Sequence, residues 1–216
     1  MLDREAGLQM VGPQTAGFRN TVDDADTDLQ VTNPAQQVAA AYQKGGATAA
    51  AQALQTATQN AGPGHASRII AASQPTINNI AGDLNNLSHA ASGMYGRGSG
   101  YAQQQAKNQF QTIYNALSAS VDQTDHSTNA GALSSQTTQA ANQIATALAS
   151  HLQPQAMFGN PTQVYGNAAE DAIGSGQGAS LSLALASTLH QHGQTSAADE
   201  VTEGSALGFD QLLTSR

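Results

Sequence analysis

Three aspartates near the N-terminus, Asp24, Asp26 and Asp28, have the spacing of the first three ligands of a calcium-binding loop. Such a loop also needs a glycine at its sixth position, for a sharp turn, and a bidentate glutamate at its twelfth. The corresponding residues here are Leu29 and Ala35. We therefore expect a solvated acidic segment and no calcium site.

Two histidines, His190 and His192, flank one glutamine near the expected end of a helix. A helical metal pair is spaced four residues apart, because that spacing places both imidazoles on one face. Residues two apart diverge, so we expect these imidazoles to interact with the last carbonyls and the helix dipole. The other histidines are isolated in the sequence, and no catalytic role is predicted for His65, His89, His126 or His151.

Gly174, Gly176 and Gly178 form a glycine-rich turn before an expected helix, where free amides could hold a phosphate. A phosphate loop also needs a Lys-Ser/Thr pair after the glycines, and this chain has none there. A nucleophile elbow is excluded too, because Ile173 occupies the position two before Ser175 that a glycine must fill. The turn is predicted to be a flexible helix connector.

Paired carboxylates occur at Glu170-Asp171 and Asp199-Glu200, with Glu203 following. General acid–base catalysis needs carboxyl groups held facing one another in a desolvated cleft. These positions are expected to be exposed or, for Asp199, to cap a helix. The sequence thus assigns no catalytic, cofactor-binding or metal-binding residue, and it favours a non-enzymatic protein without excluding an enzyme.

The composition is unusual for a folded domain, because only 10% of the residues are charged and 4% are aromatic. The seven Lys and Arg residues are scattered singly and the net charge is -8, so nucleic acid is not expected as a partner. No apolar run is long enough to span a bilayer, and residues 1–10 lack the apolar region of a signal peptide. The absence of cysteine suits a protein that is exported or crosses redox compartments.

Alanine-rich segments between capping residues and glycine stops recur along the chain, and they predict an all-α bundle of seven or eight helices. A partly ordered, irregular acidic lead-in is expected over residues 1–32, followed by a helical domain over 33–216. Lobes of 33–129 and 130–216 are an alternative to a single unit. The first helix is expected to begin at Asn33-Pro34 and to stop at Gly45-Gly46.

The strongest apolar stripe of the chain predicts a long central helix that opens at Ser99 or Gly100. Residues 180–185 alternate as in a strand, but their leucines also fit helical spacing, and we predict a helix there. A last helix is expected from Thr195 or Ser196, with Gly204 and Gly208 as contact points or a kink. The side chains expected to face the core are Phe110, Ile113, Tyr114, Leu117 and Val121 in the central helix and Val201, Leu207, Leu212 and Leu213 in the last.

Two stretches, IIAASQPTINNIAGDL at 69–84 and GASLSLALASTLHQHGQTSAADEV at 178–201, resemble helical modules of very large secreted or effector-type proteins of Gram-negative bacteria. The resemblance covers about 40 residues and rests on Leu-Ala repeats followed by glycine. It implies a non-enzymatic helical region, often N-terminal to other domains. It implies no catalytic residues.

We expect a protein-interaction or delivery module of a secreted bacterial effector or virulence-type protein, without a cofactor. Its expected partner is a host target, a chaperone or a secretion component. Secretion or translocation would use a route that needs no signal peptide, and otherwise the protein is cytoplasmic. One alternative is a hydrolase of unfamiliar type whose His and acidic residues meet only on folding. The other is a structural or assembly protein of a virion or a secretion apparatus.

Overall fold

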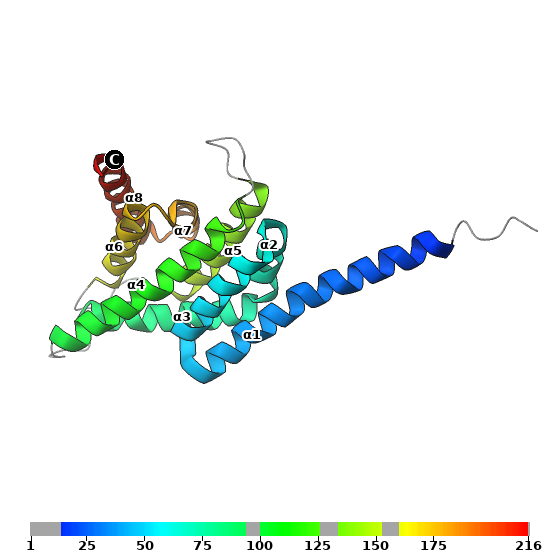
Figure 1. Ribbon diagram of the computed structural model, residues 1–216. Coiled ribbons are helices and arrows are strands. Elements are labelled where there is room, and N and C mark those ends of the chain that lie inside the picture. The colour runs from blue at the N-terminus through cyan, green and yellow to red at the C-terminus, as the bar shows by residue number, and fades with distance from the viewer. Residues whose placement is uncertain (1–13, 94–99, 126–133, 153–159, 216) are drawn as a thin grey trace, which may run out of the picture.

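Most of the described chain is helical, and turns that contain glycine, serine or proline separate several of the helices. The computed structural model describes residues 14–93, 100–125, 134–152 and 160–215, and only the backbone for 14–29 and Pro63. Within these residues there are eight α-helices and no strand, which confirms the all-α prediction (Figure 1). The helices are α1 (Gln14–Ala61), α2 (Pro63–Ala72), α3 (Gln74–Ala91), α4 (Gly100–Asp122), α5 (Ser135–His151), α6 (Pro161–Gly174), α7 (Ala179–Gln191) and α8 (Thr195–Thr214).

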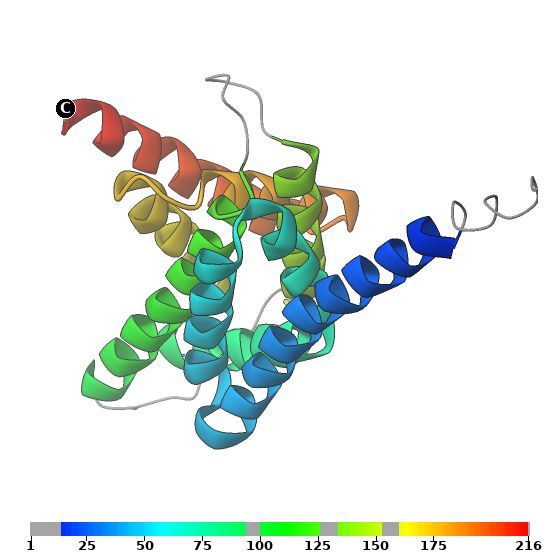
Figure 2. The same cartoon turned by 45° about the vertical axis from the view of Figure 1, so that its right-hand side comes forward.

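Helix α1 breaks at Gly46, where φ is 67° and ψ is -160°, outside the helical region. L side chains rarely adopt such a φ, whereas glycine does so at little cost. The stop predicted at Gly45-Gly46 is therefore confirmed. Figures 1 and 2 show that α1 reverses its direction near this point, so that residues 14–45 and 47–61 form two arms.

The beginning of α1 differs from the prediction. A helix was expected to start at Asn33-Pro34, but α1 begins at Gln14 and Pro34 lies inside it. Proline removes one helical hydrogen bond and usually marks a helix start. Val31, almost one turn earlier, packs against the core, and this contact favours a helix that continues across Pro34. Residues 1–13 lie outside the described part of the chain.

Helix α4 lies at the centre of the core, as its apolar stripe predicts. All five stripe residues are buried. The Phe110 ring meets the ring of Tyr165 from α6 edge to face, with 4.8 Å between centroids. The Tyr114 hydroxyl forms a 2.9 Å hydrogen bond with Ser182 of α7. Because α4 also packs against α1 and α3, it connects the N-terminal and C-terminal helices.

Helices α6 and α8 pack closely because glycines line their contact. A Cβ at Gly208 would lie 2.6 Å from the carbonyl oxygen of Glu170, and one at Gly166 would lie 2.6 Å from that of Glu200. Gly204 is buried in the same contact. The two α8 glycines are therefore the contact points that the sequence predicted, and α8 continues as a helix through both.

The C-terminal helices confirm one prediction and correct two. Residues 179–191 are helical, so the alternating leucines do not form a strand. Leu207 and Leu213, predicted to face inward, are 46% and 71% exposed, because α8 turns its glycine face toward α6. Asp199 does not cap α8, whose N-cap is Gln194 without a side-chain cap bond. The Gln194 amide instead donates to carbonyl oxygens at the end of α5.

Helix α5 packs against α2, α3 and α7. It therefore contacts helices from both of the lobes that the sequence offers as an alternative. The boundaries of those lobes, 33–129 and 130–216, and the boundary of the lead-in stay predictions.

Candidate functional site

The glycine-rich turn after α6 uses its own amides to close the helix. The amides of Ser175, Gly176 and Gln177 all donate to carbonyl oxygens of the last turns of α6, at 2.8 to 3.1 Å. Gly178 has a φ of 77°, and its amide donates to Oδ2 of Asp122 at 2.9 Å. These four amides are thus occupied within the protein. The turn is a helix connector, as predicted, and it does not present a ring of free donors to a phosphate.

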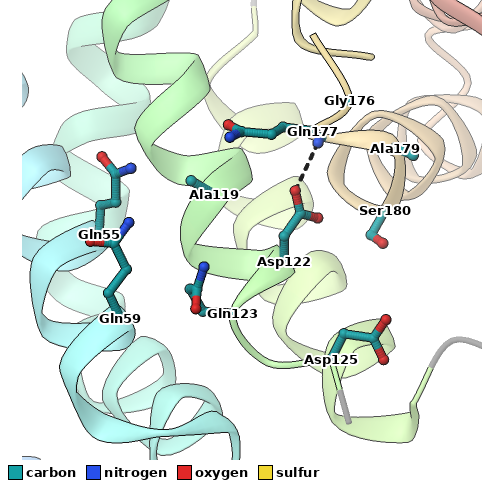
Figure 3. Close-up of a pocket in the computed structure, with 11 residues that line it drawn as sticks. Gln55, Gln59, Ala119, Asp122, Gln123, Asp125, Gly176, Gln177, Ala179 and Ser180 are labelled. Carbon is teal, nitrogen blue, oxygen red and sulfur yellow. Dashed lines mark hydrogen bonds between the residues drawn. The ribbon is translucent and has the colours of Figure 1, made fainter. Parts of the chain in front are cut away.

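Asp122 is the last residue of α4, and it approaches the start of α7 from a different part of the chain (Figure 3). Burial raises the pKa of its carboxyl group, and the charge on Asp125 adds to this effect, while the hydrogen bond from Gly178 opposes it. A carboxylate near the N-terminus of a helix also interacts favourably with the helix dipole. Asp122 therefore joins α4 to the α6–α7 connector.

A cavity of about 350 Å³ lies beside this contact. Two carboxylates, from Asp122 and Asp125, line it together with the Ser180 side chain of α7. Figure 3 shows the Gln177 side chain on one side of the cavity and glutamines of α1 on the other. Four glutamines contribute to the lining: Gln55, Gln59, Gln123 and Gln177.

Sequence reasoning missed this site. Asp122 is not among the candidates that the sequence offers, because no motif surrounds it. Its partner, Gly178, is 56 positions away in the sequence. The only available signal was a carboxylate at a helix end, and that signal is common on protein surfaces.

The described histidines do not form a metal-binding cluster. His190 is exposed in the last turn of α7 and His192 is the C-cap of that helix, so the two belong to a helix terminus, as expected. His89 is buried on α3, and the His151 ring lies beside Gly82, 3.6 Å from where a Cβ would be. His126 lies outside the described residues. Among the residues that the structure describes, no group of three or more His, Asp or Glu side chains could hold a metal ion.

His65 lines a second cavity of about 500 Å³, between the two arms of α1 and the start of α2. Pro34 is on one arm and Ala57 on the other, and the remaining lining is mainly alanine and amide side chains. Among the described residues, no acidic side chain lines this cavity.

The acidic pairs have structural contacts between α6 and α8. Glu200 accepts a 2.8 Å hydrogen bond from the side-chain amide of Asn160, the N-cap of α6. Glu170 accepts one from the Gln211 amide of α8. These contacts hold the two helices together and do not place two carboxyl groups face to face. The side chains of Asp24, Asp26 and Asp28 lie outside the described residues.

Helix α8 exposes apolar side chains in its C-terminal half. Phe209 and Leu213, one turn apart, are 37% and 71% exposed. Ala206, almost one turn before Phe209, is exposed on the same face. We call Ala206, Phe209 and Leu213 the α8 apolar row.

Comparison with protein-family models, with curated proteins and with solved structures finds no match for this chain. The resemblance to helical modules of secreted bacterial proteins therefore stays a hypothesis. Over the described residues, no helix combines the length and the apolarity needed to cross a bilayer.

Proposed function

We propose that this protein is a non-enzymatic helical module that binds another protein through the C-terminal half of α8. The observation that supports this proposal is the α8 apolar row, with Phe209 and Leu213 exposed one turn apart. A helix on a protein surface normally has one apolar face, which packs on the core. Helix α8 already packs its Gly204–Gly208 face on α6, so the row is a second apolar face.

The charges beside the row indicate the chemistry of the partner. Glu203, almost one turn before Ala206, and Asp210, next to Phe209, are exposed on α8, and the whole chain has a net charge of -8. A complementary partner has an apolar groove or helix face with Lys or Arg at its rim. Rim charges of this kind increase the rate of association and restrict the choice of partner.

The direct test combines Phe209→Ser with Leu213→Ser. Both side chains are exposed, so the double variant should keep the helical circular dichroism spectrum of the wild type. Leu183→Ser is a matched control, because Leu183 is 50% exposed on α7, outside the row. We expect the wild type and the Leu183→Ser control to capture the same protein partner and the double variant to lose it. With the purified partner, the wild type and the control should bind with similar affinity, and the double variant should bind more weakly.

Two results would favour the alternatives. Concentration-dependent self-association of the wild type that the double variant lacks would indicate an assembly protein. Turnover in a broad hydrolase screen that is lost on His65→Ala or His151→Ala, with the fold intact, would indicate an enzyme.

We also propose that the module belongs to a protein that is delivered out of a bacterial cell. The absence of cysteine and the weakly charged, amide-rich composition support this part, because such a chain can unfold and refold without disulfide exchange. Retention of a tagged chain in the cytoplasm of a secretion-competent bacterium would contradict it.

A further inference from the structure

The cavity between the end of α4 and the start of α7 is negatively charged. Asp122 and Asp125 line it, and no Lys, Arg or His does among the described residues. The start of α7 contributes about half a positive charge. The carboxylates at the cavity therefore favour a cationic ligand over an anionic one.

Asp122 has an incompletely compensated charge. Oδ2 accepts the hydrogen bond from Gly178, and the structure gives the other carboxylate oxygen no hydrogen bond from the described residues. Burial and the charge of Asp125 raise the pKa of this group despite that hydrogen bond. Buried or partly buried charges are stable when they are paired, so a cation in the cavity would relieve both effects.

Ser180 is a second observation that points to a ligand. Ser180 is 8% exposed and lines the cavity, and its hydroxyl group makes no hydrogen bond with the described residues. The hydroxyl oxygen is not among the fully buried atoms without a partner, so it is accessible from the cavity and can form a hydrogen bond with a ligand there. Figure 3 shows Ser180 on the same side of the cavity as Asp122 and Asp125.

We propose that this cavity binds a guanidinium group, held by Asp122, Asp125 and Ser180. A guanidinium is planar, carries five N–H donors and pairs with carboxylates through two parallel hydrogen bonds. The glutamine side chains around the cavity add carbonyl acceptors. The volume of about 350 Å³ suits a side chain or a small amine. The guanidinium can come from an arginine of a protein or from a free small molecule.

This proposal is independent of the α8 apolar row, because the cavity contains no residue of α8. Loss of binding at one site therefore leaves the other to be tested separately.

The test titrates the purified chain with Nα-acetyl-arginine amide and with its neutral isostere, Nα-acetyl-citrulline amide, by NMR. We expect saturable binding of the arginine compound with a Kd of about 1 mM, weaker as salt is added, and binding of the citrulline compound at least about tenfold weaker. Agmatine, which lacks the peptide groups, distinguishes the sources. Tighter binding of the arginine amide indicates a protein arginine, and tighter binding of agmatine indicates a free amine.

Variants of the cavity provide the second part of the test. Asp122→Asn keeps an oxygen for the Gly178 amide but removes the charge, and we expect it to weaken arginine binding at least about tenfold. Ser180→Ala should weaken it less. Asp171→Asn removes the same charge from an exposed position of α6 and should change the affinity by less than about twofold.

Three results would overturn the proposal. The first is the absence of saturable binding of the arginine compound to the wild type. The second is equal affinity of the wild type for the arginine and citrulline compounds. The third is an equal loss of arginine affinity in Asp122→Asn and in Asp171→Asn. The circular dichroism spectrum and the melting temperature of each variant establish that it is folded.

Discussion

Gly204 of α8 packs directly against Gly166 of α6, so that a Cβ at Gly204 would overlap the carbonyl oxygen of Gly166. Such backbone-to-backbone packing lets many weak van der Waals contacts form along two helices. This chain has few large side chains, with four Phe, five Tyr and no Trp. Close approach of small residues is therefore a principal means of burying its surface.

Gly204→Ala is expected to destabilise the fold. Alanine favours a helix over glycine by about 1 kcal/mol, but the overlap with a backbone atom costs more, and we expect a net loss of about 2 kcal/mol or more. Gly82→Ala is the control, because its Cβ would meet only the His151 ring at 3.6 Å, an ordinary contact. The control should gain about 0.5 to 1 kcal/mol in urea unfolding. Equal stability of the two variants would contradict the close α6–α8 contact.

Phe110→Ala is expected to reduce the free energy of unfolding by about 3 to 5 kcal/mol, the usual range for a buried phenylalanine. Phe110 is 1% exposed and contacts Tyr165. Tyr101→Ala, in the same helix but 78% exposed, should change the stability by less than about 0.5 kcal/mol. A loss below about 1 kcal/mol for Phe110→Ala would mean that α4 is not the core helix.

Asp122→Asn is expected to change how stability depends on pH. Burial raises the pKa of Asp122 above its ordinary value of 3.8, so the folded protein binds this proton more tightly than the unfolded chain does. The stabilisation from the protonated Asp122 carboxyl group is complete below pH 3.8, and it is lost as the pH rises through the raised pKa. Asparagine has no such proton. The variant should therefore gain stability relative to the wild type between about pH 4 and about pH 7, measured by urea unfolding.

Asp122→Ala separates charge from hydrogen bonding. It removes the acceptor of the Gly178 amide, so we expect the free energy of unfolding to fall by about 1 to 3 kcal/mol at neutral pH. If the difference in unfolding free energy between Asp122→Asn and the wild type stays constant with pH, the pKa of Asp122 does not change on folding.

Metal ions and chelators are expected to leave the melting temperature unchanged. The calcium spacing of Asp24, Asp26 and Asp28 lacks its closing glutamate, and His190 and His192 lie at a helix terminus. A rise of several degrees with calcium that Asp26→Ala abolishes, or with zinc that His190→Ala abolishes, would contradict this expectation. Scanning calorimetry with and without EDTA provides the measurement.

The helices themselves could be predicted from local signals. Gly46 requires a backbone conformation that only glycine adopts readily, and the stop predicted there is present. The Asn160 side chain accepts from the Gln163 amide, as an N-cap does, and Pro161 opens α6. The spacing of apolar residues identified α4 as the core helix. Each of these signals acts within a few residues, so the sequence contains it completely.

Tertiary structure decided what the same local signals mean in different surroundings. Asn33-Pro34 repeats the dipeptide of Asn160-Pro161, but Val31 packs on the core and the helix continues through Pro34. The leucines of α8 could face the core by their spacing, yet the helix turns its glycines toward α6.

The Asp122 cavity depends entirely on contacts between distant segments. Asp122 and Gly178 are 56 residues apart, and Gln55 comes from α1. No local pattern specifies which helix end a carboxylate will meet. Sequence alone therefore determined the helices and the central stripe of α4, because hydrogen bonding and side-chain periodicity are local. The face that α8 exposes and the acidic cavity were decided by how the folded helices pack, because packing joins residues that the sequence separates.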